Sequence, residues 1–341
     1  MGVAIGELVE KEELSLESLN GKTIGFDSYN IIYQFLSSIR GQDGTPLMDS
    51  EGNVTSHLAG ILYRAANLFE RGIKPVFVFD GKPHILKSKT IEERTKIRTE
   101  AIEKHEKALK EGNLEEARKF GSRALKLTPE MISDAKQLIE YLGFPLVQAP
   151  CDGEAQLSYM NAKGEIYGSA SQDYDCLLFG TPLLLRNIGI TGKRKVPGRN
   201  YYIDARPEKI ELRKALAGLG IDRKKLIWMG ILIGTDFNEK FPKIGPKTAI
   251  ELVKKFDSFE EIIKETKYEP DFDYGEVEKI FLEPEHIDDY KIEFRKPQRE
   301  KAIEFLCEKH DFSRERVENA VKKIDEKMSE KGGQASISKW F

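Results

Sequence analysis

The chain has 341 residues, 40% of them hydrophobic, and its 54 Lys and Arg against 57 Asp and Glu leave a formal net charge of −3. This length suits one large α/β domain or two smaller ones, and the charge argues against a simple, uniformly basic nucleic-acid binder. No apolar run reaches the roughly 18–20 residues of a membrane span, and the three cysteines show no disulfide or zinc spacing, so we expect a soluble, intracellular protein without a membrane partner.

The first half of the chain alternates short apolar segments with helical stretches. The predicted strands are 23–27, 76–80, 145–148 and 166–173, and the predicted helices include 53–70 and one that starts at Gly153. This order predicts an α/β fold with a central, mainly parallel, twisted sheet flanked by helices. Segments 182–188 and 201–203, joined by a basic turn at 192–199, then indicate a hairpin, after which the chain is mostly helical.

A basic insertion separates two of the predicted strands. Residues 81–127 hold 13 Lys and Arg against 8 Asp and Glu, and few large apolar residues recur at helical spacing there. Two helical stretches, 87–110 and 114–126, are therefore predicted to project from the core as an arch over about 84–130. The alternative is an ordinary long surface hairpin with a solvated charged face.

The C-terminal half contains a predicted helix-hairpin-helix over about 222–257. Its Gly- and Pro-rich connection turns backbone N–H groups and a helix N-terminus outward beside Lys243 and Lys247, an arrangement suited to phosphate. A plain helical connector is the alternative. We expect one domain over 1–326, followed by a flexible tail over 327–341 whose final apolar residues dock into a groove of a partner.

Acidic residues mark the points where several apolar runs stop. In open α/β sheets, ligand-binding and catalytic residues lie at these points. Like charges that meet there must be neutralised. Divalent cations with oxygen ligands, Mg²⁺ or Mn²⁺, are the natural counter-ions. The candidate metal ligands are Asp27, Asp80, Asp152, Glu154, Asp173, Asp175 and Asp236.

Several short motifs along the whole chain resemble those of one family. They include Val78-Phe-Asp80-Gly-Lys-Pro83, Gly153-Glu154-Ala-Gln156, Ser171-Gln-Asp173-Tyr-Asp175, Gly234-Thr-Asp236 and Ile244-Gly-Pro-Lys247. Together they are similar to the flap endonucleases of archaeal type, within the structure-specific 5′ nucleases. The resemblance implies a nuclease core with a helical arch and a helix-two-turn-helix motif for DNA, in a cytoplasmic protein associated with the nucleoid.

The activity that the resemblance implies is cutting of 5′-flap DNA at the junction between single strand and duplex, with 5′–3′ exonuclease activity, in Okazaki fragment maturation and repair. Two Mg²⁺ ions, replaceable by Mn²⁺, would hydrolyse the phosphodiester. Asp27, Asp80, Asp152 and Glu154 would surround one ion, and Asp173, Asp175 and Asp236 the other, with Glu154 shared. Lys87 and Arg94 would be catalytic through charge stabilisation on the phosphate.

The resemblance also implies DNA contacts and a protein partner. Tyr33 would stack on a nucleobase beside the cut, although an aromatic residue in an apolar helix is more often part of a core. The further DNA contacts would be Gly2, Arg98, Lys126, Lys243, Gly245 and Lys247. A monomer is expected, which would bind the sliding clamp (PCNA) through Gln334, Ile337, Trp340 and Phe341.

Three residues depart from the family pattern. Asp152 stands where Glu is usual and is equally well read as the N-cap of a helix. Lys243 stands where the hairpin usually has Gly, and His84 replaces a second Pro. Two other functions remain open: a ribonuclease of the PIN fold, and a catalytically weak scaffold for DNA junctions.

Overall fold

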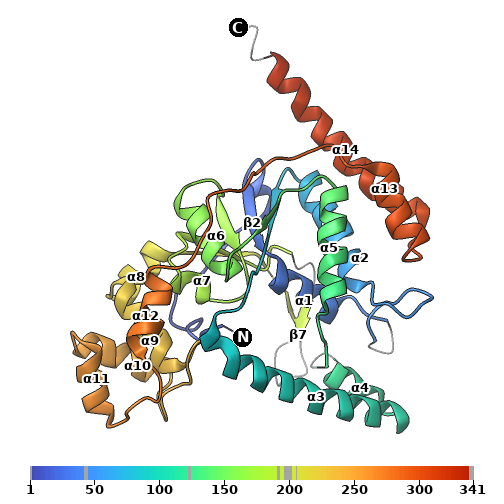
Figure 1. Ribbon diagram of the computed structural model, residues 1–341. Coiled ribbons are helices and arrows are strands. Elements are labelled where there is room, and N and C mark those ends of the chain that lie inside the picture. The colour runs from blue at the N-terminus through green and yellow to red at the C-terminus, as the bar shows by residue number, and fades with distance from the viewer. Residues whose placement is uncertain are drawn as a thin grey trace.

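A seven-stranded sheet forms the centre of the computed structural model, which describes residues 2–41, 45–121, 124–189, 193–195, 202–204 and 206–337 (Figure 1). Its strand order is β1-β9-β6-β5-β2-β3-β4. The parallel strands are β2 (Thr23–Asp27), β3 (Lys74–Phe79), β4 (Leu146–Gln148), β5 (Gly168–Ala170) and β6 (Leu183–Arg186). At one edge β9 (Glu208–Glu211) and β1 (Glu12–Glu13) are antiparallel. The predicted α/β fold with a mainly parallel sheet is confirmed.

The hairpin predicted after the parallel strands is paired differently. β6 pairs with β9, so that Leu184 lies opposite Ile210, and both side chains are buried. The segment near 201–203 instead contributes β8 (Tyr202–Asp204), which pairs with β7 (Lys193–Lys195) in a separate two-stranded sheet. The predicted pairing of 182–188 with 201–203 is therefore wrong. β9 pairs with β6 instead, because its Ile210 buries an apolar side chain in the core.

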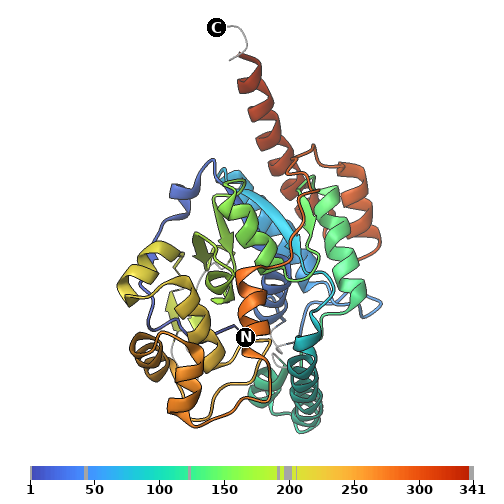
Figure 2. The ribbon, with the colours of Figure 1, turned by 60° about the vertical axis from the view of Figure 1, so that its left-hand side comes forward.

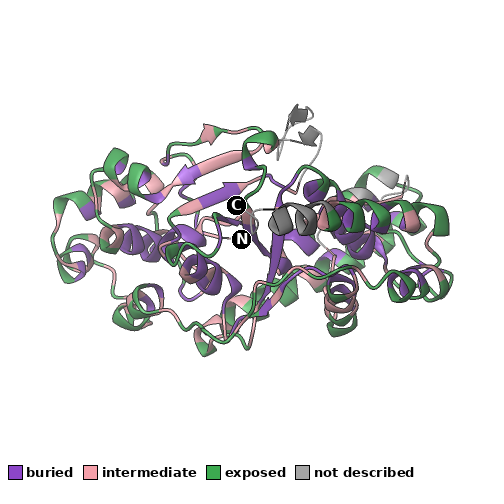
Figure 3. Ribbon diagram, turned by 90° about the horizontal axis from the view of Figure 1, so that it is seen from above, coloured by how far each residue is buried: buried purple, intermediate pink, exposed green. Residues whose placement is uncertain are grey.

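Helices cover both faces of this sheet. On β3, Phe77 and Phe79 face the core built with α1 (Ser28–Ser38), α2 (Ser56–Glu70) and α5 (Pro129–Tyr141). Val76 and Val78 face α6 (Gly153–Ala162) on the other side. Because side chains alternate along a strand, one that is buried on both faces must be apolar throughout. Figure 3 shows burial concentrated in the sheet and in the helices against it.

A second apolar core lies beside β6 and β9. It contains α7 (Asp175–Leu178), α8 (Leu212–Leu219), α9 (Arg223–Ile233), α10 (Pro246–Lys255), α11 (Phe259–Thr266) and α12 (Tyr274–Leu282). The predicted helix-hairpin-helix corresponds to α9 and α10. None of the helices in the described ranges is both long enough and apolar enough to cross a membrane.

The charged insertion after β3 lies away from the sheet. A 3-10 turn, η2 (Ile85–Lys87), leads into α3 (Ser88–Lys110), which packs against α4 (Leu114–Gly121). Among the described side chains of this pair, the buried ones are alanines, Ala101 and Ala108 on α3 and Ala117 on α4. Figures 1 and 2 show the two helices extending at the base of the molecule. α4 ends at Gly121, before the predicted residue 126, and the next helix, α5, begins at Pro129 with Thr128 as its N-cap.

An extended strap, residues 283–298, carries the chain from α12 back to the C-terminal helices. The side chain of Gln156 accepts a hydrogen bond from the Ile287 N–H at 2.9 Å and donates one to the Ile287 carbonyl at 3.0 Å. Tyr290, Ile292 and Phe294 of the strap pack against the apolar cluster between β3, β4 and α6. The strap is thus fixed to the sheet.

The chain ends in α13 (Arg299–Ile303), the π-helical turn η3 (Glu304–Glu308) and α14 (Arg314–Ile337). α14 packs against α2, with Lys323 donating to Glu70 at 2.9 Å, and then extends beyond the body (Figures 1 and 2). Its backbone is helical through 327–337, where the loss of periodicity predicts a flexible linker.

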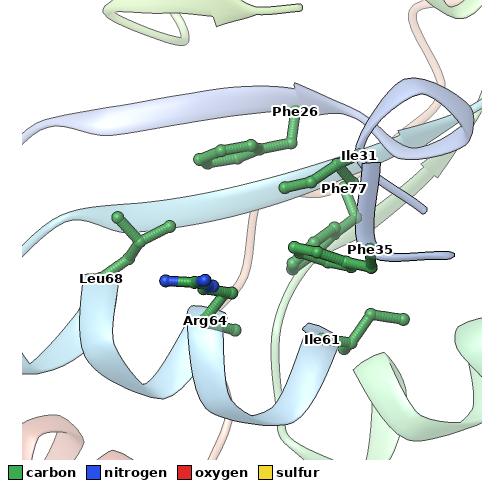
Figure 4. Close-up of a pocket in the computed structure, with 8 residues that line it drawn as sticks. Phe26, Ile31, Phe35, Ile61, Arg64, Leu68 and Phe77 are labelled. Atoms are coloured by element: carbon green, nitrogen blue, oxygen red, sulfur yellow. The ribbon is translucent and has the colours of Figure 1, made fainter. Parts of the chain in front are cut away.

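A small cavity remains between the sheet and α2. Figure 4 shows Phe26 and Phe77 on the sheet side, with Leu68 and Arg64 on the helix. Its volume of about 10 Å³ leaves room for at most a single water. It is a packing defect of the core, too small for a ligand.

Two glycines with the same backbone conformation differ in how close they lie to the strap. Gly143 and Gly164 both stand two residues beyond a helix, with φ of 76° and 74°. A Cβ at Gly143 would lie 1.9 Å from the carbonyl oxygen of Arg295 in the strap, whereas at Gly164 it would meet nothing within 4 Å.

We expect Gly164→Ala to lower the free energy of unfolding by about 1 kcal/mol, the cost of a left-handed backbone for alanine. Gly143→Ala should lower it by about 2–4 kcal/mol, because the strap must also move. Denaturant unfolding of the two variants measures the difference, and equal losses would contradict the contact between Gly143 and the strap.

Candidate active site

Acidic residues gather at the carboxyl ends of the parallel strands. Asp27 is the last residue of β2, Asp80 follows β3, and Asp173 follows β5. Because β2 lies between β3 and β5 and runs parallel to both, these three ends meet at one edge of the sheet. Asp152 and Glu154 reach the same edge from the start of α6, directly after β4.

The electrostatic coupling among these side chains shows that they form one cluster. Burial, followed by the charge of Asp80, raises the pKa of Asp27 to about 8. Burial also raises the pKa of Asp80 to about 6, against an opposing hydrogen bond from the Gly153 N–H and with Asp152 and Asp236 adding to the rise.

The same holds on the α7 side of the cluster. Burial raises the pKa of Asp175 to about 7, with Asp236 and Asp173 contributing. The pKa of Glu154 lies well above its usual range because of burial and then the charges of Asp175 and Asp27. Each of the seven predicted carboxylates is therefore electrostatically coupled to at least one other.

The chemistry of this donor set fits hard divalent cations. The donors are carboxylate oxygens, and four of the seven acids have raised pKa values, so the cluster lacks positive charge. Within the described part of the chain, however, no three acidic, His or Cys side chains converge as the ligands of one ion.

Two cations from the arch contact the cluster directly. Lys87 forms an ion pair with Asp152, and Arg94 donates to Asp236 at 2.5 Å. Burial by itself would lower the pKa of Lys87, but Asp152, Glu154 and Asp236 outweigh burial and raise it. The hydroxyl of Thr90 adds a hydrogen bond to the Asp236 carbonyl at 3.0 Å. The base of α3 is therefore docked on the acids.

Asp152 does not cap its helix. It occupies the N-cap position of α6, but its side chain makes no capping hydrogen bond. Its carboxylate instead pairs with Lys87 and accepts from the Cys151 thiol at 3.7 Å. The alternative reading of Asp152 as an N-cap side chain is therefore wrong, because a nearby ammonium group competes for the same oxygens.

The motif after Asp80 explains how the arch begins beside α6. The N–H of Gly81 donates to the Cys151 carbonyl at 2.6 Å, and a Cβ at Gly81 would lie 2.3 Å from two carbonyl oxygens of the 149–150 segment. Glycine thus permits the close approach of the two loops. His84 accepts from the Leu86 N–H at 3.3 Å and caps η2, the turn that presents Lys87.

The N-terminal segment lies against the cluster. The Gly2 N–H donates to Asp173 at 3.0 Å, and the Val3 N–H donates to Asp175 at 2.7 Å. A Cβ at Gly2 would lie 2.8 Å from that of Asp173. The predicted DNA contact at Gly2 is thereby placed within the acidic centre.

The other predicted DNA contacts are spread over the surface around the cluster. Tyr33 is an exposed aromatic on α1, Arg98 is half-buried on α3, and Lys126 is exposed beyond α4. In the hairpin between α9 and α10, Gly245 is the N-cap of α10 and Lys243 and Lys247 are exposed. In Figure 1, α9 and α10 lie at the lower left of the molecule, and the arch extends from near them along the base toward the lower right.

Lys243 has a left-handed backbone, with φ of 62°. This conformation favours glycine, which is the residue expected there from the resemblance. The structure thus gives the physical reason for the family pattern and locates a strained residue in the hairpin.

Two residues that hold the carboxylates escaped the sequence-based prediction. Asn30 donates to Asp173 at 2.9 Å, and Ser171 donates to Asp27 at 3.2 Å. Their only sequence signal is proximity, because Asn30 follows Asp27 by three residues and Ser171 precedes Asp173 by two.

The predicted clamp-binding residues lie at the end of the chain. Gln334 and Ile337 belong to the helical backbone of α14, whereas Trp340 and Phe341 lie outside the described residues.

The chain is similar to known proteins over its whole length. Two family models match the chain, the XPG N-terminal domain over residues 3–101 and the XPG I-region over residues 143–236. Flap endonuclease 1 of Thermococcus onnurineus is 49% identical over 342 residues, which cover 100% of this chain and 99% of that protein.

Solved structures agree with these sequence matches. The flap endonuclease-1 from Methanococcus jannaschii matches with a TM-score of 0.77 and 37% identity, over 97% of this chain and 100% of its own. The junction-resolving enzyme GEN1 in complex with product DNA, Mg²⁺ and Mn²⁺ has a TM-score of 0.57 and 17% identity, over 94% and 74% of the two chains. At that identity the likeness concerns the fold alone.

The raised pKa values predict how the metal-free protein responds to pH. Asp80, Asp175 and Asp27 hold protons up to about pH 6, 7 and 8 in the folded state, whereas unfolded aspartates lose them near pH 4. Between pH 5 and 8 the folded state binds more protons, so the free energy of unfolding falls as pH rises.

We expect calorimetry in EDTA to show a lower Tm at pH 8 than at pH 5. Added Mg²⁺ should raise the Tm more at pH 8, because fewer protons then compete for the carboxylates. Asp175→Asn should reduce the pH dependence, since it removes one titrating group. An Mg²⁺ effect of the same size at both pH values would contradict a metal site in this cluster.

Proposed function

Since this chain belongs to the flap endonuclease family of metal-dependent, structure-specific nucleases, we propose that it cuts branched DNA where a 5′ flap meets the duplex. The observation that carries the proposal is the cluster of seven carboxylates around the carboxyl ends of the parallel strands, with Lys87 and Arg94 of the arch bonded to it. The same centre would support 5′–3′ exonuclease action. The cellular roles would be Okazaki fragment maturation and DNA repair at the nucleoid.

The proposed cofactor is a pair of Mg²⁺ ions, for which Mn²⁺ can substitute. When bound, the ions supply a nucleophilic water and neutralise charge on the phosphate and the leaving oxygen. Asp27, Asp80, Asp152 and Glu154 would hold one ion, and Asp173, Asp175 and Asp236 the other, with Glu154 between them. The oxygen-only donor set and its shortage of positive charge support this assignment.

Lys87 and Arg94 act as fixed positive charges in the proposed reaction. The raised pKa of Lys87 keeps its ammonium group charged throughout the neutral range, so it stabilises negative charge instead of transferring a proton. Both side chains now pair with carboxylates of the cluster. A phosphate that enters the centre would take over these cations as its own partners.

Other parts of the chain position the substrate. The arch of α3 and α4 would surround the single-stranded flap, and Tyr33 would stack on a base beside the cut. The hairpin before α10 would bind the duplex backbone through the N-terminus of that helix with Lys243, Gly245 and Lys247. Arg98 and Lys126 would add phosphate contacts along the arch.

The proposed reaction is tested by cleavage of matched flap, nick, overhang and RNA substrates with and without Mg²⁺. Asp80→Ala or Asp173→Ala should lower flap cleavage by at least about 10³-fold while retaining DNA binding, because the ligand set is broken. Asp325→Ala, an exposed acid on α14, is the matched control.

The same assay gives a different result for each alternative function. Undiminished cleavage by both Ala variants would overturn the proposed centre. Preference for RNA would indicate a PIN-type ribonuclease instead. Tight flap binding without turnover, restored by Asp152→Glu, would indicate a junction scaffold.

The sliding clamp is the proposed protein partner, through Gln334, Ile337, Trp340 and Phe341. The spacing of the three apolar residues supports a short helix that docks into an apolar groove. Deletion of 334–341 should abolish stimulation of cleavage by the clamp and leave basal cleavage unchanged, because the tail lies outside the acidic centre. Stimulation that survives the deletion would contradict this partner.

A further inference from the structure

We propose that Asn30 and Ser171 are positioning residues that hold Asp27 and Asp173 in a fixed relation, so that the cluster binds two divalent cations together. This inference rests on the proposed function, since it concerns the same centre. It assigns a role to two uncharged side chains that neither the carboxylate pattern nor the arch explains.

A closed ring of hydrogen bonds carries the inference. The N–H of Asn30 donates to one oxygen of Asp27 at 3.0 Å, and its side-chain amide donates to Asp173 Oδ2 at 2.9 Å. The N–H of Asp173 donates to Ser171 Oγ at 3.2 Å, and Ser171 Oγ donates to the second oxygen of Asp27 at 3.2 Å. The ring thus runs from Asp27 through Asn30, Asp173 and Ser171 back to Asp27.

The orientation of the Asn30 amide follows from its other partners. The backbone N–H of Gln172 can only donate, and it lies 3.2 Å from Asn30 Oδ1. Gln34 donates to the same oxygen at 2.6 Å. With both lone pairs of Oδ1 engaged, the NH₂ group must face Asp173. The amide is held from α1 on one side and from the loop after β5 on the other.

The ring connects ligands of both proposed ions. Asp27 is assigned to one ion and Asp173 to the other, and they stand at the ends of neighbouring parallel strands. Each of these carboxylates has one oxygen bonded by Asn30 and the other oxygen bonded elsewhere, for Asp173 by the Gly2 N–H at 3.0 Å. Rotation of either carboxylate would break a bond in the ring. A fixed relation between the two groups therefore favours simultaneous occupation of both sites.

Asn30→Leu removes the amide with little change in volume and leaves the Asp173 oxygen without this donor. We expect the second Mn²⁺ to bind about 10-fold more weakly, and kcat on a 5′-flap substrate to fall about 10–100-fold with KM unchanged. Ser171→Ala, which removes one oxygen of the same ring, should shift both quantities in the same direction. Excess Mn²⁺ should restore kcat in both variants.

The measurement is electron paramagnetic resonance titration of full-length protein with MnCl₂, without DNA. Asn161→Leu is the matched control, because Asn161 donates to the Ile166 carbonyl at 3.0 Å at the opposite end of β5. It should lower the Tm without changing Mn²⁺ binding. The inference is overturned if Asn30→Leu and Ser171→Ala bind two Mn²⁺ ions as tightly as the wild type, or if the wild type binds fewer than two.

Metal binding and cleavage are measured separately, so the two proposals fail in different ways. Wild-type protein that binds two Mn²⁺ ions but does not cut flaps contradicts the proposed function and leaves the ring intact. Wild-type cleavage with undisturbed Mn²⁺ binding in both ring variants contradicts only the positioning role.

Discussion

Repulsion among seven carboxylates around the carboxyl ends of the parallel strands is the constraint to which the surrounding structure responds. The strand ends, the starts of α6 and α7 and the loop after α9 deliver the acids, and main-chain N–H groups of Gly2, Val3 and Gly153 then bond to them. Lys87 and Arg94 supply full positive charges from the arch. These compensations are incomplete, as the raised pKa values of the buried acids show, and the remaining deficit is what divalent cations would fill.

Lys87 and Arg94 of the arch connect the binding of metal ions with the binding of the substrate. Lys87 and Arg94 form ion pairs with Asp152 and Asp236, two of the acids that are proposed as metal ligands. Arrival of ions would release these side chains, and arrival of a phosphate would give them a new partner. Metal binding and substrate binding would therefore support each other at the base of α3, where Thr90 also bonds to the Asp236 carbonyl.

Local patterns in the sequence predicted the parallel strands and their terminal acids, because a strand buried on both faces is a continuous apolar run. Long-range pairing was harder to predict, because nothing near residue 201 shows that β9, with Ile210, pairs with β6 instead. The cap formed by His84 and the ring through Asn30 also escaped prediction, since their partners are fixed only by the tertiary fold. The role of Asp152 was ambiguous for the same reason, because the ammonium group of Lys87, which pairs with its carboxylate, comes from another element.

The strap over 283–298 has a consequence for the order in which the chain folds. It returns the last helices to the first core, where Val317, Val321 and Ile324 belong to the same apolar cluster as Leu19 and Leu58. Contacts between such distant segments form slowly, because a long loop must close first. During synthesis the acidic centre would therefore rest on an open core until about residue 324 has left the ribosome. The core beneath the acidic centre is therefore complete only once α14 has been synthesised.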